Sequence, residues 1–526
     1  MTLRAQAQGR IRFGDLYALL AALLGLGAAQ VASAQGLEAP ATTETRAEPA
    51  QTDAPPTNAA PPAGDATPTG DATPSNAAPP AGDVAPSVAP AAPWRVREAL
   101  GAPDWLWFGA EHRLRFEHLE NDFRSAATGD ARALSLRTLV NLELRFAWFV
   151  TGAELQDSRV YATGATLLST TLVNPLALLR AYVGVRARDV FATGDQLALT
   201  AGRMTLDVGS RRLVARNEFR NTINGFTGVD AAWTSPREHV VRVFAVMPVR
   251  RRPSDPDALR DNDFAFDHEN PHALLWGAFF GSEPLGPALR LEAYALGLDE
   301  RDASDAPSAN RRLVTLGTRL LRAPVAGELD LQVEAMLQVG RSRSSAAATD
   351  LRDLTHRAGS LHLSAGYRVD VGAAPRLVLQ YDFASGDRDP DDGVNERFDP
   401  LFAARRFEFG PTGLFGAIAR SNLHSPGARL ELAPHGNVEV LVGYRALALA
   451  SARDAWTAAA VRDESGRSGR FVGHQLETRL RWNVLPRNLT LEMGGAALLQ
   501  GNFAERALGA PAPNALYVYT QATGTI

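Results

Sequence analysis

Two arginine-rich segments contain residue types that could bind an acidic ligand. The first, GRMTLDVGSRRLVARNEFRNTINGF, lies between two strand-like stretches and carries five arginines: Arg203, Arg211, Arg212, Arg216 and Arg220. A guanidinium presents a planar fork of N–H donors that binds a carboxylate through two hydrogen bonds. Inside a water-filled lumen these five side chains would form a ladder for a carboxylated sugar chain. On an outer loop these arginines would only be solvated. The sequence does not decide between a position in the lumen and a position on an outer loop.

The second segment, YDFASGDRDPDDGVNERFDPLFAARRFEFGPTGLFG, combines acids and bases between Tyr381 and Gly416. The spacing of three of its aspartates, Asp387, Asp389 and Asp391, is that of a calcium-binding loop, which also needs a central glycine and a closing glutamate. Asp392 and Phe398 occupy those two positions. We therefore favour a turn that folds charged groups into or across a pore, with Arg405 and Arg406 on its far side.

The usual catalytic motifs are missing from the sequence. It has no GxSxG, no HExxH, no phosphate-binding glycine loop and no cysteine, and its ten histidines are scattered singly. We therefore expect no enzyme, no metal site and no cofactor.

The elements that must position these charges are strands. Beyond Asp104, apolar and polar residues alternate with a period of two over eight to ten positions, again and again. One example sets Leu134, Leu136, Thr138, Val140, Leu142 and Leu144 against Ser135, Arg137, Asn141, Glu143 and Arg145. A sandwich strand is typically about 5 to 6 residues long, whereas a tilted strand needs about 9 to 11 residues to cross a bilayer. Aromatic residues at the strand ends fit the girdles of a membrane barrel.

The predicted fold is therefore an all-β, antiparallel transmembrane barrel. A sheet can sit in lipid only when it closes on itself, because an open edge leaves unpaired amides. Roughly 420 residues at about 23 per strand and connection give 16 to 20 strands. We expect Leu516 to Gln521 to close the barrel, with the last residues overhanging. Four further arginines alternate with apolar neighbours on their strands and would add positive charge to the lumen: Arg137, Arg145, Arg180 and Arg186. Glu143 would partly offset this charge.

The N-terminal region predicts export. Three arginines precede an apolar run from Leu16 to Ala29, and a small-residue cleavage site follows, so residues 1–34 form a signal peptide. Residues 35–93, rich in Ala and Pro, form a disordered linker, and 94–526 form the barrel. Residues 1–35 carry a formal charge of +2 and residues 36–83 carry −6. Residues 84–526 therefore contribute nothing to the net charge of −4. This balance does not suggest nucleic-acid binding.

Several pieces of the chain resemble the alginate export family of Gram-negative outer-membrane proteins. They are GRMTLDVGSRRLVARNEFRNTINGFTGV (202–229), YDFASGDRDPDDG with RFDPLF (381–402), and SNLHSPGARLELAP (421–434). The chain looks like a member of the broad family and not like a close copy of the dedicated alginate exporter. The resemblance implies a monomeric barrel of 18 strands with an arginine-rich constriction. Carried onto this sequence, the ring would consist of Arg203, Arg211, Arg212, Arg216 and Arg220, with Asp382 and Asp387 as counter-charges.

These observations lead to one functional hypothesis and two alternatives. The first is a passive outer-membrane channel for an anionic polysaccharide or its oligomers. The second is a substrate-selective porin for small anions or sugars, and the third is a structural barrel that tethers the envelope through its linker. The expected partners are the polysaccharide, outer-membrane lipid, the barrel-assembly machinery and a periplasmic protein that meets the linker.

Overall fold

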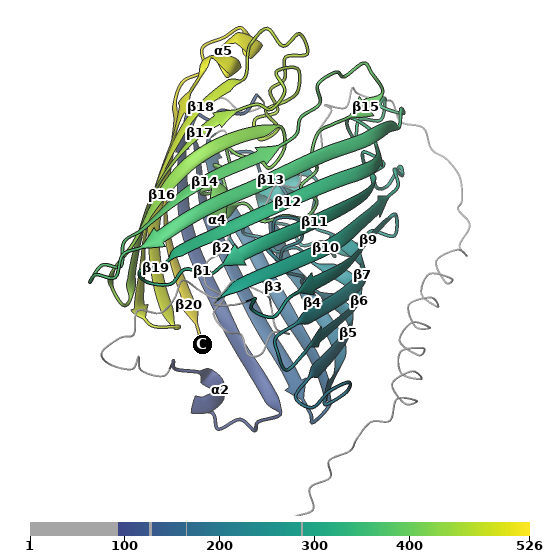
Figure 1. Cartoon of the computed structure of the whole chain (residues 1–526), viewed down its shortest axis with the longest axis vertical. Coiled ribbons are helices and arrows are strands. Elements are labelled where there is room, and N and C mark those ends of the chain that lie inside the picture. The colour runs from purple at the N-terminus through teal and green to yellow at the C-terminus, as the bar shows by residue number, and fades with distance from the viewer. Residues whose placement is uncertain (1–92, 126–128, 165, 286–287) are drawn as a thin grey trace, which may run out of the picture. The chain divides into compact units, whose positions relative to one another are not determined.

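A computed structural model describes residues 93–526 apart from 126–128, 165 and 286–287. The predicted signal peptide and all but the last residue of the predicted linker lie outside the described residues. The described chain consists mostly of strands (Figure 1). The long strands are β1 (Leu106–Glu120), β2 (Ala131–Arg145), β3 (Phe149–Gly164), β4 (Asn174–Arg188), β5 (Gln196–Met204), β6 (Phe226–Thr234), β7 (Val240–Arg250), β9 (Ala273–Gly281), β10 (Leu289–Glu300), β11 (Arg312–Arg322), β12 (Leu329–Ser342), β13 (Leu354–Arg368), β14 (Arg376–Ala384), β16 (Leu423–His435), β17 (Val438–Ala448), β18 (Phe471–Leu485), β19 (Leu489–Gln500) and β20 (Ala515–Thr525).

These eighteen strands form a closed antiparallel barrel, which confirms the predicted fold class. Each strand pairs with the next, and β20 pairs with β1 to complete the ring. Two further strands have two residues each, β8 (His268–Glu269) and β15 (Val394–Asn395). The described helices are α2 (Val96–Ala99), α3 (Pro256–Asp261), α4 (Arg406–Phe409) and α5 (Asn502–Leu508). Within the described part of the chain, no helix has the length and apolar character needed to cross a membrane.

The closing strand extends further than the sequence pattern predicted. β20 runs to Thr525 and is hydrogen-bonded to β1 on one side and to β19 on the other. The expected overhang after Gln521 is therefore wrong. The physical reason is that both neighbours continue to this level, so the backbone of the last residues is better satisfied in the sheet than outside it.

The two faces of each strand have opposite chemistry. On β2, Leu142 is 48% exposed on the outer face, whereas Arg137 and Glu143 are at most 9% exposed on the inner face. An apolar outer wall suits lipid, and a polar inner wall suits a lumen. The alternation read from the sequence therefore assigns the inner and outer faces correctly on this strand.

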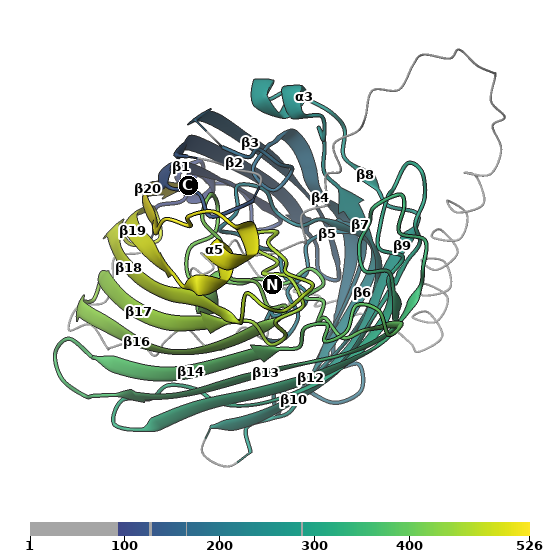
Figure 2. The same ribbon diagram turned by 90° about the horizontal axis from the view of Figure 1, so that it is seen from above.

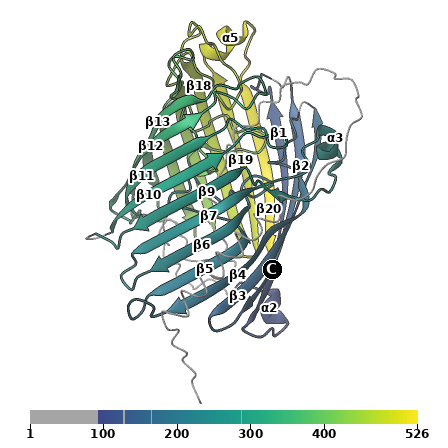
Figure 3. The ribbon, with the colours of Figure 1, turned by 90° about the vertical axis from the view of Figure 1, so that its right-hand side faces the viewer.

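The two ends of the barrel differ in the length of their connections. Both the C-terminus and α2 lie at one end, and α5 lies at the other (Figure 3). At the end with the terminus, strands are joined by short turns such as Gly436–Asn437 between β16 and β17. At the other end, long segments such as 385–422 connect the strands. We call these the turn end and the loop end.

Aromatic rings packed over glycines help to fix the register of neighbouring strands. Tyr294 of β10 lies directly over Gly317 of β11, its cross-strand partner, and a Cβ atom at Gly317 would overlap the tyrosine ring. The same tyrosine hydroxyl donates a hydrogen bond to Glu334 of β12 over 2.6 Å. The glycine thus allows one ring to connect three adjacent strands.

Replacing Gly317 with alanine is expected to lower the free energy of unfolding by about 2 kcal/mol, because the ring must move and its bond to Glu334 is lost. Urea unfolding in lipid vesicles measures the change. The matched control is Gly359→Ala on β13, where an added Cβ meets only the Met336 carbonyl oxygen at 3.5 Å. Equal stability of the two variants would contradict this role of Gly317.

Candidate functional site

Two long connections from the loop end fold into the lumen (Figure 2). We call them the first inner loop (205–225, between β5 and β6) and the second inner loop (385–422, between β14 and β16). Phe402 N–H donates to the Leu213 carbonyl over 2.8 Å, and Ala215 N–H donates to the Phe402 carbonyl over 3.0 Å. Val214 and Phe415 are completely buried. The two loops therefore pack as one body inside the wall.

Arginines of the inner loops bind glutamates of the wall. Arg212 forms ion pairs with Glu334 of β12 and with Glu408 of the second inner loop. Further contacts of this kind join Arg216 Nη2 to Glu154 Oε1 of β3 at 2.7 Å, and Arg406 to Glu477 Oε1 of β18 at 2.6 Å and to Glu492 Oε1 of β19 at 3.5 Å. All these carboxylates lie on the inner face of the barrel or within the loops. The guanidiniums are thus neutralised by protein carboxylates.

Arginines of the wall in turn bind the backbone of the first inner loop. Arg113 donates to the carbonyl oxygens of Glu218 and Arg220, in each case over 2.7 Å. Arg137 donates to the Glu218 carbonyl over 2.6 Å and pairs with Glu111 at 2.8 Å. Because buried charges are stable only when they are paired and hydrogen-bonded, these contacts hold the first inner loop against β1 and β2.

The remaining arginines of the predicted ring lie in different surroundings. Arg203 stands opposite Ala181, one residue from the inward-facing pair Tyr182 and Gly202, so it faces outward. It pairs there with Glu269 at 2.6 Å. The other three belong to the inner loops: Arg211 is half-buried, whereas Arg220 and Arg405 are buried. The structure therefore gathers the loop arginines inside the barrel and leaves Arg203 on the outer face.

Predicted residues of β2 and β4 also lie on the inner wall, between the middle of these strands and the turn end. Arg180 retains 30% exposure of its side chain while it pairs with Glu154 at 3.6 Å. Arg145 pairs with Glu143 and stacks on Trp107 at 3.9 Å, and Arg186 is half-buried on the same strand as Arg180. These arginines keep part of their surface accessible within the lumen.

Two arginines of the inner wall that were not predicted as site residues are partly accessible. Arg479 and Arg481 of β18 are half-buried and lie near Glu439, at 3.9 Å and 3.6 Å. Arg481 also pairs with Glu492 of β19 at 3.0 Å. The signal was present in the sequence, because both arginines alternate with the apolar residues that end at Trp482.

Two of the three aspartates with calcium-like spacing are engaged by a basic group, and the third lies beside another carboxylate. Asp389 and Asp391 accept contacts from Arg453 at 2.8 Å and 3.4 Å. Asp387 donates its backbone N–H to Asp454 over 2.8 Å, and burial together with the Asp454 carboxylate raises the pKa of Asp387. Among the described residues, these three aspartates do not bring their carboxylate oxygens close enough together to hold one metal ion.

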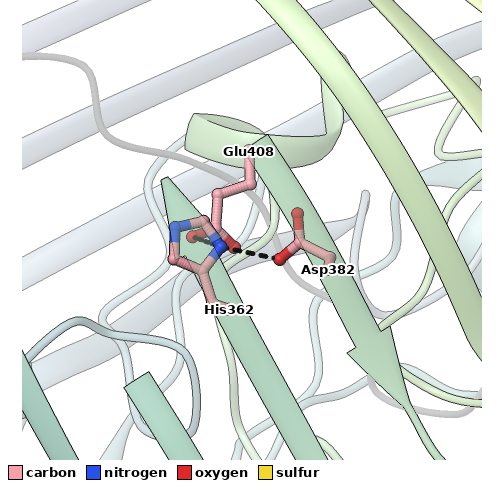
Figure 4. A group of neighbouring side chains, drawn as sticks. All are labelled: His362, Asp382 and Glu408. Atoms are coloured by element: carbon pink, nitrogen blue, oxygen red, sulfur yellow. Dashed lines mark hydrogen bonds and ion pairs between the residues drawn. The ribbon is translucent and has the colours of Figure 1, made fainter. Parts of the chain in front are cut away.

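One buried cluster has the residue types of a metal site: His362 of β13, Asp382 of β14 and Glu408 of α4 (Figure 4). The His362 Nδ1 atom lies 2.8 Å from Asp382 Oδ1 and 3.5 Å from Glu408 Oε1. However, Glu408 already pairs with two arginines, and Asp382 pairs with another at 2.9 Å: Arg212, Arg420 and Arg445. Three guanidiniums oppose a further cation here. The cluster therefore acts as an ion network that ties α4 to the wall.

A closed barrel with an apolar outer wall and a charged interior defines an outer-membrane channel. The chain belongs to the alginate export family, whose model matches residues 104–518. This confirms the resemblance found in the sequence. Family and fold are those of channel proteins, which are not enzymes. In such barrels the short turns face the periplasm and the long loops face the outside.

Solved porin structures share the fold. OccD3 (OpdP) of Pseudomonas aeruginosa superposes with a TM-score of 0.51 at 12% identity, covering 80% of this chain and 91% of that chain. OccAB1 of Acinetobacter baumannii superposes with a TM-score of 0.51 at 13% identity, covering 80% of this chain and 97% of that chain. OpdQ of P. aeruginosa superposes with a TM-score of 0.50 at 12% identity, covering 80% of this chain and 97% of that chain. No curated protein sequence matches the chain.

Proposed function

We propose that the protein is a passive outer-membrane channel for an anionic, carboxylated carbohydrate such as a polyuronate or its oligomers. The supporting observation is the group of partly accessible arginines on the inner wall between its middle and the turn end: Arg145, Arg180, Arg186, Arg479 and Arg481. Guanidiniums at these positions lower the energy of a carboxylate that enters the lumen. The neighbouring glutamates keep binding weak enough for release. Passage follows the concentration gradient, so direction depends on where the solute is made.

Uptake of small anions is the second candidate, and the inner loops favour it. They are held in the lumen by buried ion pairs such as Arg212 with Glu334, so they narrow the passage in this conformation. A narrow passage suits a short acid better than a polymer. The two candidates share the same arginines and differ in the length of the solute that they admit.

Planar-bilayer recordings of the mature protein separate the two candidates. For the polysaccharide channel we expect anion preference and block of the current by oligouronates. The duration of each block should increase with the chain length of the oligouronate. Neutral oligosaccharides of the same length serve as the control. Passage of small carboxylates without any block by oligouronates would favour the porin, and a current without anion preference would contradict both.

A further inference from the structure

Three arginines cluster on the outer face of the barrel at its loop end. Arg312 begins β11, Arg341 is the last residue but one of β12, and Arg357 lies near the start of β13. The register sets Arg312 directly opposite Arg341 and sets Arg357 opposite Val339, diagonal to Arg341. Because side chains alternate between the faces, all three point to the same side of the sheet.

The cluster borders the apolar outer wall. Val339 is 42% exposed and Leu337 is 57% exposed, and they occupy the next positions of the same face of β12. On β11, Val314 and Leu316 continue this face below Arg312 and are also exposed. A charge on the lipid-facing wall costs about 2–4 kcal/mol at the midplane and much less at the interface. The arginines are therefore at headgroup depth, immediately beyond the hydrocarbon band.

Protein carboxylates do not neutralise this cluster. Arg312 pairs with Asp353 at 3.1 Å, but its side chain is still 50% exposed. The side chains of Arg341 and Arg357 are exposed and form no hydrogen bond or ion pair with any residue that the structure describes, although their backbones are paired in the sheet. Like charges directly opposite on neighbouring strands repel each other. An anion placed between these side chains would remove that repulsion.

The neighbouring acids are already engaged by other arginines. Asp299, which stands opposite Arg312 on β10, lies 3.8 Å from Arg301. Asp353 also lies 3.5 Å from Arg343. Glu396, which follows β15, pairs with Arg388. The surplus of positive charge is thus centred on Arg341 and Arg357.

We propose that Arg312, Arg341 and Arg357 bind the phosphate group of a phosphorylated glycolipid in the outer leaflet. A phosphate monoester carries close to two negative charges and three acceptor oxygens, which match several guanidinium forks. The exposed aliphatic wall next to the cluster provides the contact surface for acyl chains. This continuity favours a lipid over free phosphate. The proposal concerns the outer wall and is independent of what passes through the lumen.

Native mass spectrometry of the mature protein, refolded in a phosphate-free detergent, tests the site. The protein is titrated with bis-phosphorylated lipid A and with the same lipid after removal of its phosphates. The Arg341→Gln/Arg357→Gln double variant is expected to bind the phosphorylated lipid about tenfold more weakly, because it loses charge-assisted hydrogen bonds. The dephosphorylated lipid should bind equally to the variant and the unaltered protein, and inorganic phosphate alone should not displace the bound lipid.

The matched control is Arg467→Gln/Arg506→Gln. It removes two exposed arginines from loop-end segments that do not belong to the outer-wall cluster. The control should bind both lipids as the unaltered protein does. Equal affinity of the Arg341→Gln/Arg357→Gln variant and the unaltered protein would overturn the proposal, as would an equal loss in the control or a loss that persists without the phosphates. Heat-modifiable migration on gels checks folding, and the single variant Arg341→Gln, with an intermediate loss, serves if the double variant does not fold.

Discussion

Replacing Arg212 with glutamine is expected to lower the free energy of unfolding by about 3–5 kcal/mol and to raise the single-channel conductance. The side chains of Arg212, Glu334 and Glu408 are each at most 2% exposed. Removing one partner of a buried ion pair leaves the other charge without compensation, and this is the main source of such a loss. The same change frees the first inner loop from β12, so the lumen should widen. Urea unfolding in vesicles and planar-bilayer recordings measure the two effects.

The adjacent residue provides the control for this experiment. Arg211 is half-buried, and its guanidinium lies against the Phe407 ring, whose centre is 5.8 Å from the guanidinium carbon. Arg211→Gln should therefore change stability and conductance far less than Arg212→Gln. Adding Glu334→Gln to Arg212→Gln should recover part of the lost stability, because it removes the uncompensated charge. Equal effects at positions 211 and 212 would contradict the role that we assign to Arg212.

The Arg180→Gln/Arg186→Gln double variant is expected to lower the anion-over-cation permeability ratio by up to about thirtyfold at low salt, because the two charges attract an anion and repel a cation equally. Two unit charges about 8 Å from a permeating ion in water contribute about 0.5 kcal/mol each, and salt screens this contribution. Both arginines are half-buried on the inner face of β4. The reversal potential in a KCl gradient measures the ratio. The fold should persist, because Glu154 keeps its shorter contact with Arg216 at 2.7 Å.

The double variant Arg467→Gln/Arg506→Gln again provides the comparison, since it removes the same formal charge from exposed loop residues. It should leave the reversal potential unchanged. If the Arg180→Gln/Arg186→Gln variant also keeps the original potential, these arginines do not influence the permeating ions, and our proposed function loses its supporting observation. An effect that stays equally large at high salt would also disagree with an electrostatic origin in water.

The sequence by itself determined the barrel. Apolar and polar residues alternate along strands such as β2, where Leu142 and Glu143 face opposite sides. This pattern is local, because a strand turns each successive side chain to the other face whatever its neighbours are. The length of the chain and of its strands then limited the strand number. The segments that resemble the alginate export family were also recognisable without a structure.

Only the tertiary structure decided what the charges do. Arg211 and Arg212 are consecutive and chemically identical, yet only Arg212 is enclosed between Glu334 and Glu408, which lie 122 and 196 residues away along the chain. Arg203 belongs to the same basic segment but faces outward, because β5 continues to Met204 and fixes its side. Ion pairing depends on which distant residues meet when the barrel closes and its loops turn inward. Local sequence patterns do not contain that information, so they identified the arginines without showing which are held by the protein and which face the lumen.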